Sequence, residues 1–216
     1  MENFRTWLEI LYFISGPIIA VIAFFALGQI RVAKEQIEEQ KKLLKITSKR
    51  DALKLTSNQI EIYLDKIIKL QNILDKKLAS ENIDILSKYE VEITSDSLKL
   101  IPPKETFNTD DLEKIIQELA DVANAMESFS TYFISGVADE KIAFFSIGST
   151  YCNSVKRLLP VLIPLSNEKN FLSIINLYKI WAMRIESESL QKQKQNIEKQ
   201  LKSKKETTIK VVGDND

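Results

Sequence analysis

The sequence predicts an all-α protein in which one N-terminal transmembrane helix precedes a cytoplasmic bundle of about four long helices. An uncharged run of 21 residues, 10–30, lies near the N-terminus. Beyond it, long stretches rich in Lys, Glu, Gln, Leu and Ile are interrupted by few of the chain's five Gly and five Pro residues. Such uninterrupted stretches favour helix.

Residues 10–30 are the candidate membrane-spanning segment, with the sequence ILYFISGPIIAVIAFFALGQI. As a helix they would extend roughly 30 Å, which matches the hydrocarbon core of a bilayer. A cleaved signal peptide is the main alternative, because Ala26-Leu27-Gly28 resembles a small-residue cleavage site. However, the N-terminal MENFR has no basic excess, and the apolar stretch is longer than in a typical signal peptide. We therefore assign residues 1–30 as a transmembrane anchor.

Basic residues are concentrated on the C-terminal side of this anchor. Only Arg5 precedes the apolar run, whereas the twenty residues after it contain Arg31, Lys34, Lys41, Lys42, Lys45, Lys49 and Arg50. Because a basic flank stays in the cytoplasm, we expect the N-terminus outside the inner membrane and the C-terminal domain inside. Within the anchor, small residues form a stripe on which two anchors could pack, at Gly16, Ala20 and Ala23.

The remaining chain divides into three predicted segments. Residues 31–58 predict a basic helical linker or stalk, residues 59–190 a helical bundle domain, and residues 191–216 a charged helical extension with a disordered tail beginning near Thr207. An apolar residue recurs every seven positions, at Ile46, Leu53, Ile60, Ile67 and Leu74. The second seam of this repeat is mixed in character, which favours an amphipathic helix on its own domain over an intermolecular coiled coil.

Within the bundle, the first helix is expected to bury Ile60, Leu64, Ile68 and Leu78. An irregular segment follows over residues 80–108. There Tyr89, Val91 and Ile93 alternate with glutamates, as in a short strand, but without a recognisable partner strand an extended loop is equally compatible.

Three further helices are expected after Pro102-Pro103. One begins at Asp110 and ends at Ser135-Gly136, with an apolar face at Leu112, Ile115, Ile116, Leu119, Ala123, Met126, Phe129 and Phe133. The next begins at Asp139-Glu140, is expected to end at Pro160 and Pro164, and buries Ile142, Phe145, Tyr151, Val155, Leu158 and Leu159. The last begins near Asn170 and buries Phe171, Ile174, Ile175, Tyr178, Trp181 and Ile185.

Several classes of chemistry are excluded by composition. The chain has no histidine, which removes His-dependent nucleophilic catalysis and His-based zinc sites. Its single cysteine, Cys152, cannot form an intramolecular disulfide and is expected to be a small buried side chain. Thirty basic residues balance thirty acidic ones, so no nucleic-acid partner is expected. We predict no catalytic, cofactor-binding or metal-binding residues, no cofactor, and no enzymatic activity.

The carboxylates are expected to have structural roles. Asp110-Asp111 and Asp139-Glu140 lie where helix N-termini favour negative charge. Glu127 lies beside an apolar helical face and is expected to form a buried ion pair across the bundle with Arg157 or Arg184.

The order of features over residues 127–185 resembles a family of small bacterial single-pass membrane proteins of unknown function that carry a cytoplasmic helical domain. The residues that carry the resemblance are Glu127, Phe129, Phe133, Gly136, Asp139, Glu140, Arg157 and Trp181, together with the anchor and basic linker. The resemblance implies a bacterial helical domain without established activity or catalytic residues.

Two functions are compatible with these features. The leading prediction is a membrane-tethered, non-enzymatic interaction module whose partners are the lipid bilayer and either another protein or a second copy of the chain. The alternative is a membrane-disrupting effector, as in phage defence, whose oligomerisation clusters the transmembrane helices.

Overall fold

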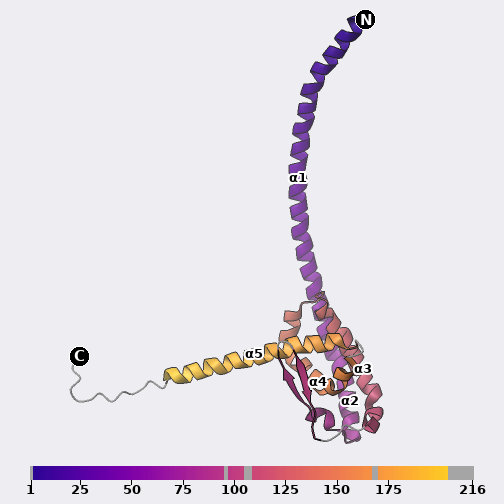
Figure 1. The fold of residues 1–216 in the computed structure, drawn as a ribbon, viewed down its shortest axis with the longest axis vertical. Helices are drawn as coiled ribbons and strands as arrows, with labels where there is room; N and C mark the ends of the chain where they lie inside the picture. The colour runs from indigo at the N-terminus through magenta and orange to yellow at the C-terminus, as the bar shows by residue number, and fades with distance from the viewer. Residues whose placement is uncertain (1, 95–96, 105–108, 167–169, 204–216) are drawn as a thin grey trace, which may run out of the picture. The chain divides into compact units, whose positions relative to one another are not determined.

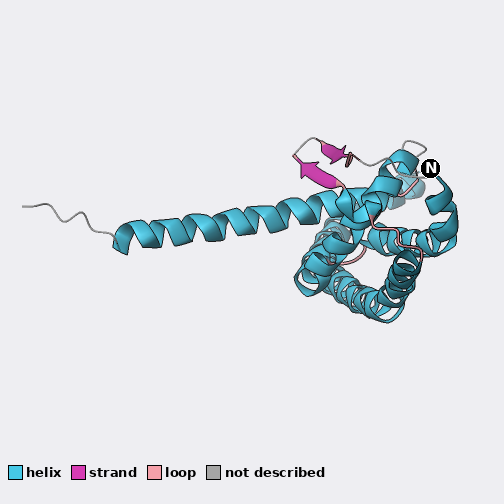
Figure 2. Ribbon diagram, turned by 90° about the horizontal axis from the view of Figure 1, so that it is seen from below, coloured by secondary structure: helices cyan, strands magenta, loops and turns pink. Residues whose placement is uncertain are grey.

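The computed structural model describes residues 2–94, 97–104, 109–166 and 170–203. Its elements are labelled in Figure 1 and follow the order α1 (Glu2–Ile62), η1 (Tyr63–Ile67), α2 (Ile68–Ser80), η2 (Ile85–Lys88), β1 (Glu90–Ile93), β2 (Leu98–Ile101), α3 (Thr109–Ile134), α4 (Glu140–Ser166) and α5 (Leu172–Ser203). The predicted all-α class is confirmed, with one short hairpin added (Figure 2). The tail predicted from Thr207 lies outside the described residues.

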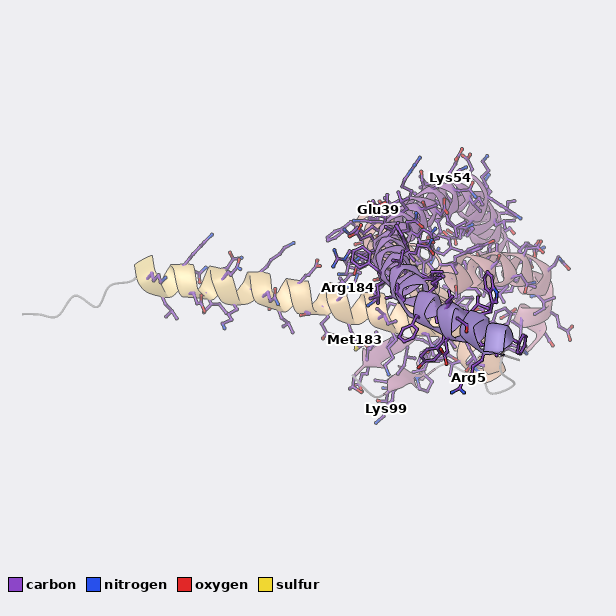
Figure 3. All side chains as sticks on the ribbon, turned by 90° about the horizontal axis from the view of Figure 1, so that it is seen from above. Arg5, Glu39, Lys54, Lys99, Met183 and Arg184 are labelled. Carbon is purple, nitrogen blue, oxygen red and sulfur yellow. The ribbon has the colours of Figure 1, made fainter. Side chains whose placement is uncertain are left out.

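The chain forms two compact units, Met1–Asp51 and Ala52–Asp216. In the first unit, every described side chain of residues 4–51 is exposed, and Arg5 and Glu39 project from α1 in Figure 3. The N-terminal part of α1 is long and apolar enough to cross a membrane, and none of its apolar window is buried. It is therefore not a core helix of the second unit.

The second unit begins earlier than the predicted boundary at residue 59. Thr56 is completely buried, and its Oγ1 donates a hydrogen bond to the carbonyl of Ala52. The same Oγ1 accepts a hydrogen bond of 2.7 Å from the backbone N–H of Asp139, which precedes α4. Gln59 is buried as well. Because Thr56 is polar, sequence patterning assigned it to the basic linker or stalk, whereas Gln59 lies within the predicted bundle domain.

A π-helical turn, η1, joins α1 to α2 without breaking the helix. Tyr63, Ile67 and Gln71, which follow one another at intervals of four and so share one face of the helix, are all buried. Leu64, which was expected to be buried, is half exposed because it lies next to this face.

Aromatic side chains from four helical elements meet in the centre of the second unit. The ring of Tyr151 lies 4.9 Å from that of Trp181 and 5.7 Å from that of Phe129, measured between centroids. Tyr63 contacts Phe129 from the η1 side, and Phe144 contacts Trp181 from α4. Tilted and edge-on contacts of this kind are the favoured geometries of aromatic pairs.

Helix α4 continues through both prolines to Ser166, so the predicted end at Pro160 and Pro164 is wrong. Each proline costs about 3 kcal/mol in a helix interior. The four apolar residues Leu158, Leu159, Val161 and Leu162 are buried along the same stretch, and each contributes about 1.5–3 kcal/mol on full burial. Pro164 is exposed and Pro160 only partly buried, which leaves water access to the unpaired carbonyls.

The segment around Val91 is a strand with a partner, which decides between the two alternatives that the sequence left open. Strand β1 pairs antiparallel with β2, placing Val91 opposite Leu100 and Ile93 opposite Leu98. These four side chains are partly buried against the core, and β1 contacts α5 (Figure 2). The sequence alternation of Leu98 and Leu100 with Lys99 carried this information, and cross-strand apolar pairs of this kind stabilise a hairpin.

Besides Leu64, three residues that were expected in the core are exposed. Phe145 is 81% exposed, Ile116 is 47% exposed and Ile142 is 41% exposed. In α4, residues close to Ile142 and Phe145 are buried instead, namely Ala143, Phe144 and Ile147. The apolar face of α4 is thus rotated relative to the one predicted from the largest side chains.

The turn between α3 and α4 follows its expected chemistry. Gly136 adopts a left-handed conformation with φ of 74°, which ends α3 as predicted. Asp139 Oδ1 accepts a hydrogen bond of 3.2 Å from the backbone N–H of Ile142, so it caps the start of α4.

Candidate functional site

The second unit contains a cavity of about 420 Å³ between α2, η2, α3 and α4. Its walls are mainly apolar, and its lining residues are Gln71, Leu74, Asp75, Leu78, Ala79, Ile83, Asp84, Leu86, Ser87, Val122, Ser154, Arg157 and Leu158. This volume lies in the range of small-molecule sites, which span roughly 300–1,000 Å³. The sequence did not identify this cavity, because its lining comes from four separate segments.

Two buried polar side chains meet at the cavity wall. Ser154 Oγ donates a hydrogen bond of 2.9 Å to Gln71 Oε1. Gln71 Nε2 lies 3.6 Å from the sulfur of Met126, which is only a weak acceptor. One N–H of Gln71 therefore has no strong acceptor among the described residues.

Tyr63 is buried beside this polar pair. Burial raises the pKa of the Tyr63 hydroxyl, and the nearby polar side chains of Ser154 and Gln71 partly oppose that rise. Tyr63 Oη makes no hydrogen bond to a described residue. The hydroxyl is thus neutral at ordinary pH and retains an unused donor hydrogen.

The charged groups of the cavity wall are balanced. Arg157 forms two hydrogen bonds to the carboxylate of Asp75, of 2.9 Å and 3.3 Å. Asp84 pairs with Lys88 at 3.1 Å. The predicted pairing of Arg157 with Glu127 does not form.

Glu127 instead caps α5. Its two carboxylate oxygens accept hydrogen bonds from the backbone N–H groups of Ser173 and Ile174, at 3.2 Å and 3.0 Å. A carboxylate satisfies unpaired N–H groups at a helix N-terminus and complements the helix dipole. The role of Glu127 is therefore structural, but its partner is a backbone rather than an arginine.

Replacing Glu127 with alanine is expected to lower the free energy of unfolding by about 1–2 kcal/mol, because two N–H groups lose their acceptor. Hydrogen exchange should accelerate most at the amides of Ser173 and Ile174. Exposed Glu113, on the same helix, provides the matched control, Glu113→Ala. Equal effects of the two substitutions would contradict the capping role.

Arg184, the third residue of the predicted ion pair, lies on α5 next to Met183 (Figure 3) and binds Glu140 rather than Glu127. The distance from Arg184 Nη1 to Glu140 Oε1 is 2.9 Å. The indole N–H of Trp181 donates to the same carboxylate, and the guanidinium lies 4.5 Å from the ring centre of Phe144. This cluster joins the start of α4 to α5.

A second candidate site is an exposed seam on α1. Gly16, Ala23, Ile30, Ile37 and Leu44 recur at a spacing of seven, and all are exposed. The predicted stripe of Gly16, Ala20 and Ala23 shares two members with it. A repeat of seven keeps residues on the side of a helix that faces a parallel partner in a left-handed coil. We call these five residues the α1 seam.

Cys152 is buried, as predicted, and burial raises the pKa of its thiol to about 12. At pH 8 only about one thiol in ten thousand would be ionised. Alkylation by iodoacetamide is therefore expected to be far slower in the folded chain than after unfolding in guanidinium. Labelling of the folded chain at the rate of a free cysteine peptide, followed by mass spectrometry, would contradict this.

No group of three or more metal-ligating side chains occurs in the part of the chain that the structure describes. No protein-family model matches the chain, and no curated protein or solved structure matches it either. The family resemblance noted from the sequence remains a prediction.

Proposed function

We propose that the chain is a membrane-tethered, non-enzymatic interaction module that associates with a second copy of itself through the α1 seam. The observation that carries this proposal is that every residue from 4 to 51 is exposed along one continuous helix. Most helices in proteins are stabilised by packing an apolar face rather than by intrinsic propensity. Lipid and a second helix together would supply such packing.

The two parts of the seam suit the two environments that α1 would meet. Gly16 and Ala23 lie within residues 10–30, where small side chains let helix backbones approach in lipid. Ile37 and Leu44 follow the anchor and are 51% and 66% exposed. In water, burying two such aliphatic side chains per chain favours association by roughly 1.5–3 kcal/mol each.

A homotypic partner fits this geometry better than an unrelated helix. Identical anchors inserted in the same direction hold two copies of α1 parallel, with seam residues at equal depth. The basic flank that begins at Arg31 favours a cytoplasmic position for the second unit, so all copies would share one orientation. Confinement to one membrane also raises the effective concentration of the partner.

Disulfide crosslinking of the full-length chain in membranes tests this proposal. Ile37→Cys places a thiol on the seam, whereas Lys42→Cys places one on another face of the same helix. Both are combined with Cys152→Ser so that the introduced thiol is the only one. Mild oxidation is expected to produce a dimer with Ile37→Cys at several times the yield obtained with Lys42→Cys.

Equal crosslinking of the two variants would indicate random collision and would contradict the seam. A monomer with both variants would contradict self-association altogether. A crosslinked product of Ile37→Cys whose mass differs from that of a dimer would show that the seam binds another protein, which would contradict a second copy as the partner.

A further inference from the structure

We infer that the cavity between α2, η2, α3 and α4 binds a small, uncharged, mainly apolar molecule that carries a hydrogen-bond-accepting oxygen such as a ketone or amide carbonyl. This site belongs to the second unit and does not use the α1 seam. It would give the membrane-tethered module a ligand-responsive domain.

The apolar part of the ligand is indicated by the cavity walls. Leu74, Leu86, Val122 and Leu158 are buried and line a space of about 420 Å³. The cavity opens to solvent at one side, where Ala79, Asp84 and Ser87 are exposed. Mainly apolar walls with a few polar groups are typical of small-molecule sites, and the aliphatic side chains favour an apolar ligand surface.

The accepting oxygen is indicated by an excess of donors at and behind one wall. Gln71 and Ser154 line the cavity, and Tyr63 is buried behind them, so that their side chains together carry four donor hydrogens. Within the described residues, the strong acceptor that the structure supplies to them is Gln71 Oε1, which is used by Ser154. The second N–H of Gln71 and the hydroxyl of Tyr63 remain, and a ligand carbonyl at the Gln71 side of the cavity would accept from the former.

The absence of charge on the ligand follows from the paired ions around the cavity. Arg157 is neutralised by Asp75, and Asp84 is paired with Lys88. An anionic ligand would have to displace Asp75 from a bidentate contact, and a cationic one would compete with Arg157. A neutral molecule leaves both pairs intact.

Methyl NMR of the full-length chain in lipid nanodiscs tests the inference with two probes. The probes are 4-phenylbutan-2-one, which carries a ketone, and n-butylbenzene, which has a similar shape without oxygen. The ketone is expected to shift the methyl signals of Leu74, Val122 and Leu158 saturably, while those of Ile174 and Leu177 stay unchanged. Because the two probes differ in hydrophobicity as well as in the oxygen, the hydrogen bond is measured by how a substitution at Gln71 changes the affinity of each probe, with concentrations taken as free probe in water.

Two variants separate the apolar and polar parts of the site. Ala79→Phe, at an exposed position on the cavity wall, fills the space and should abolish both responses, whereas Asn124→Phe on the exposed side of α3 should not. Gln71→Met should weaken binding of the ketone about tenfold, as expected for the loss of one hydrogen bond, but keep binding of butylbenzene. Unchanged Ile174 and Leu177 signals show that each variant is folded.

Non-saturable shifts, or shifts that persist in Ala79→Phe, would overturn the site. An affinity for the ketone that Gln71→Met leaves unchanged would overturn the accepting oxygen. Neither result bears on crosslinking of the α1 seam, so the two proposals can fail separately.

Discussion

Replacing Trp181 with alanine is expected to lower the free energy of unfolding of the second unit by about 3–5 kcal/mol, the usual cost of removing a large buried aromatic side chain. Trp181 is completely buried, and its ring contacts Phe133, Phe144 and Tyr151 from three directions. Its indole N–H also donates to Glu140, which binds Arg184. The substitution therefore removes packing against α3 and α4. It also removes the indole N–H that donates to the Glu140 carboxylate.

Urea unfolding of the detergent-solubilised chain, followed by far-ultraviolet circular dichroism, measures this effect. Phe145→Ala is the matched control, because this phenylalanine is 81% exposed. Its loss should change the free energy of unfolding by less than about 0.5 kcal/mol. Similar losses for the two substitutions would contradict the arrangement of α4 and α5.

The second large effect concerns the anchor. Ile19→Arg combined with Ile22→Arg places two cations near the middle of residues 10–30, and each costs about 2.5–3.5 kcal/mol at the centre of a membrane-spanning helix. The double variant is expected to move from the membrane pellet to the soluble fraction. Its second unit should keep its helical circular dichroism, because neither residue contributes to that core.

The control for this experiment is Ile19→Leu combined with Ile22→Leu, which should remain in the pellet. Blotting of the two fractions after high-speed centrifugation gives the distribution. A double arginine variant that stays with the membranes as fully as the control would show that attachment does not depend on residues 10–30.

Much of the helical fold follows from local sequence signals. The end of α3 at Gly136 and the cap at Asp139 could be predicted because each residue has a specific backbone role. The end of α4 could not, because the local cost of Pro160 and Pro164 is outweighed by apolar contacts with other parts of the chain. The face of α4 was misassigned because Phe145 was judged by its hydrophobicity, while small Ala143 occupies the interior.

The candidate sites differ in how far the sequence can indicate them. The stripe in the anchor could be proposed because its spacing is local, and it remains a prediction. The cavity could not, because Gln71 and Ser154 are 83 positions apart in the sequence and both are polar. The same holds for the ion partners, since nothing in the sequence distinguishes Asp75 from Glu127 as the acceptor for Arg157. One signal was available, namely the polar residues Thr56, Gln59 and Gln71 at helical spacing on an otherwise apolar face.

Alkaline extraction of membranes that contain the full-length chain tests membrane insertion most directly. Carbonate at high pH strips peripheral proteins and leaves integral ones in the bilayer. If residues 10–30 span the membrane, the chain should stay in the pellet, and peptide mass spectrometry should recover these residues from it. Release of the chain into the wash, or a retained chain that begins after Gly28, would contradict the tether and with it the parallel pairing of α1.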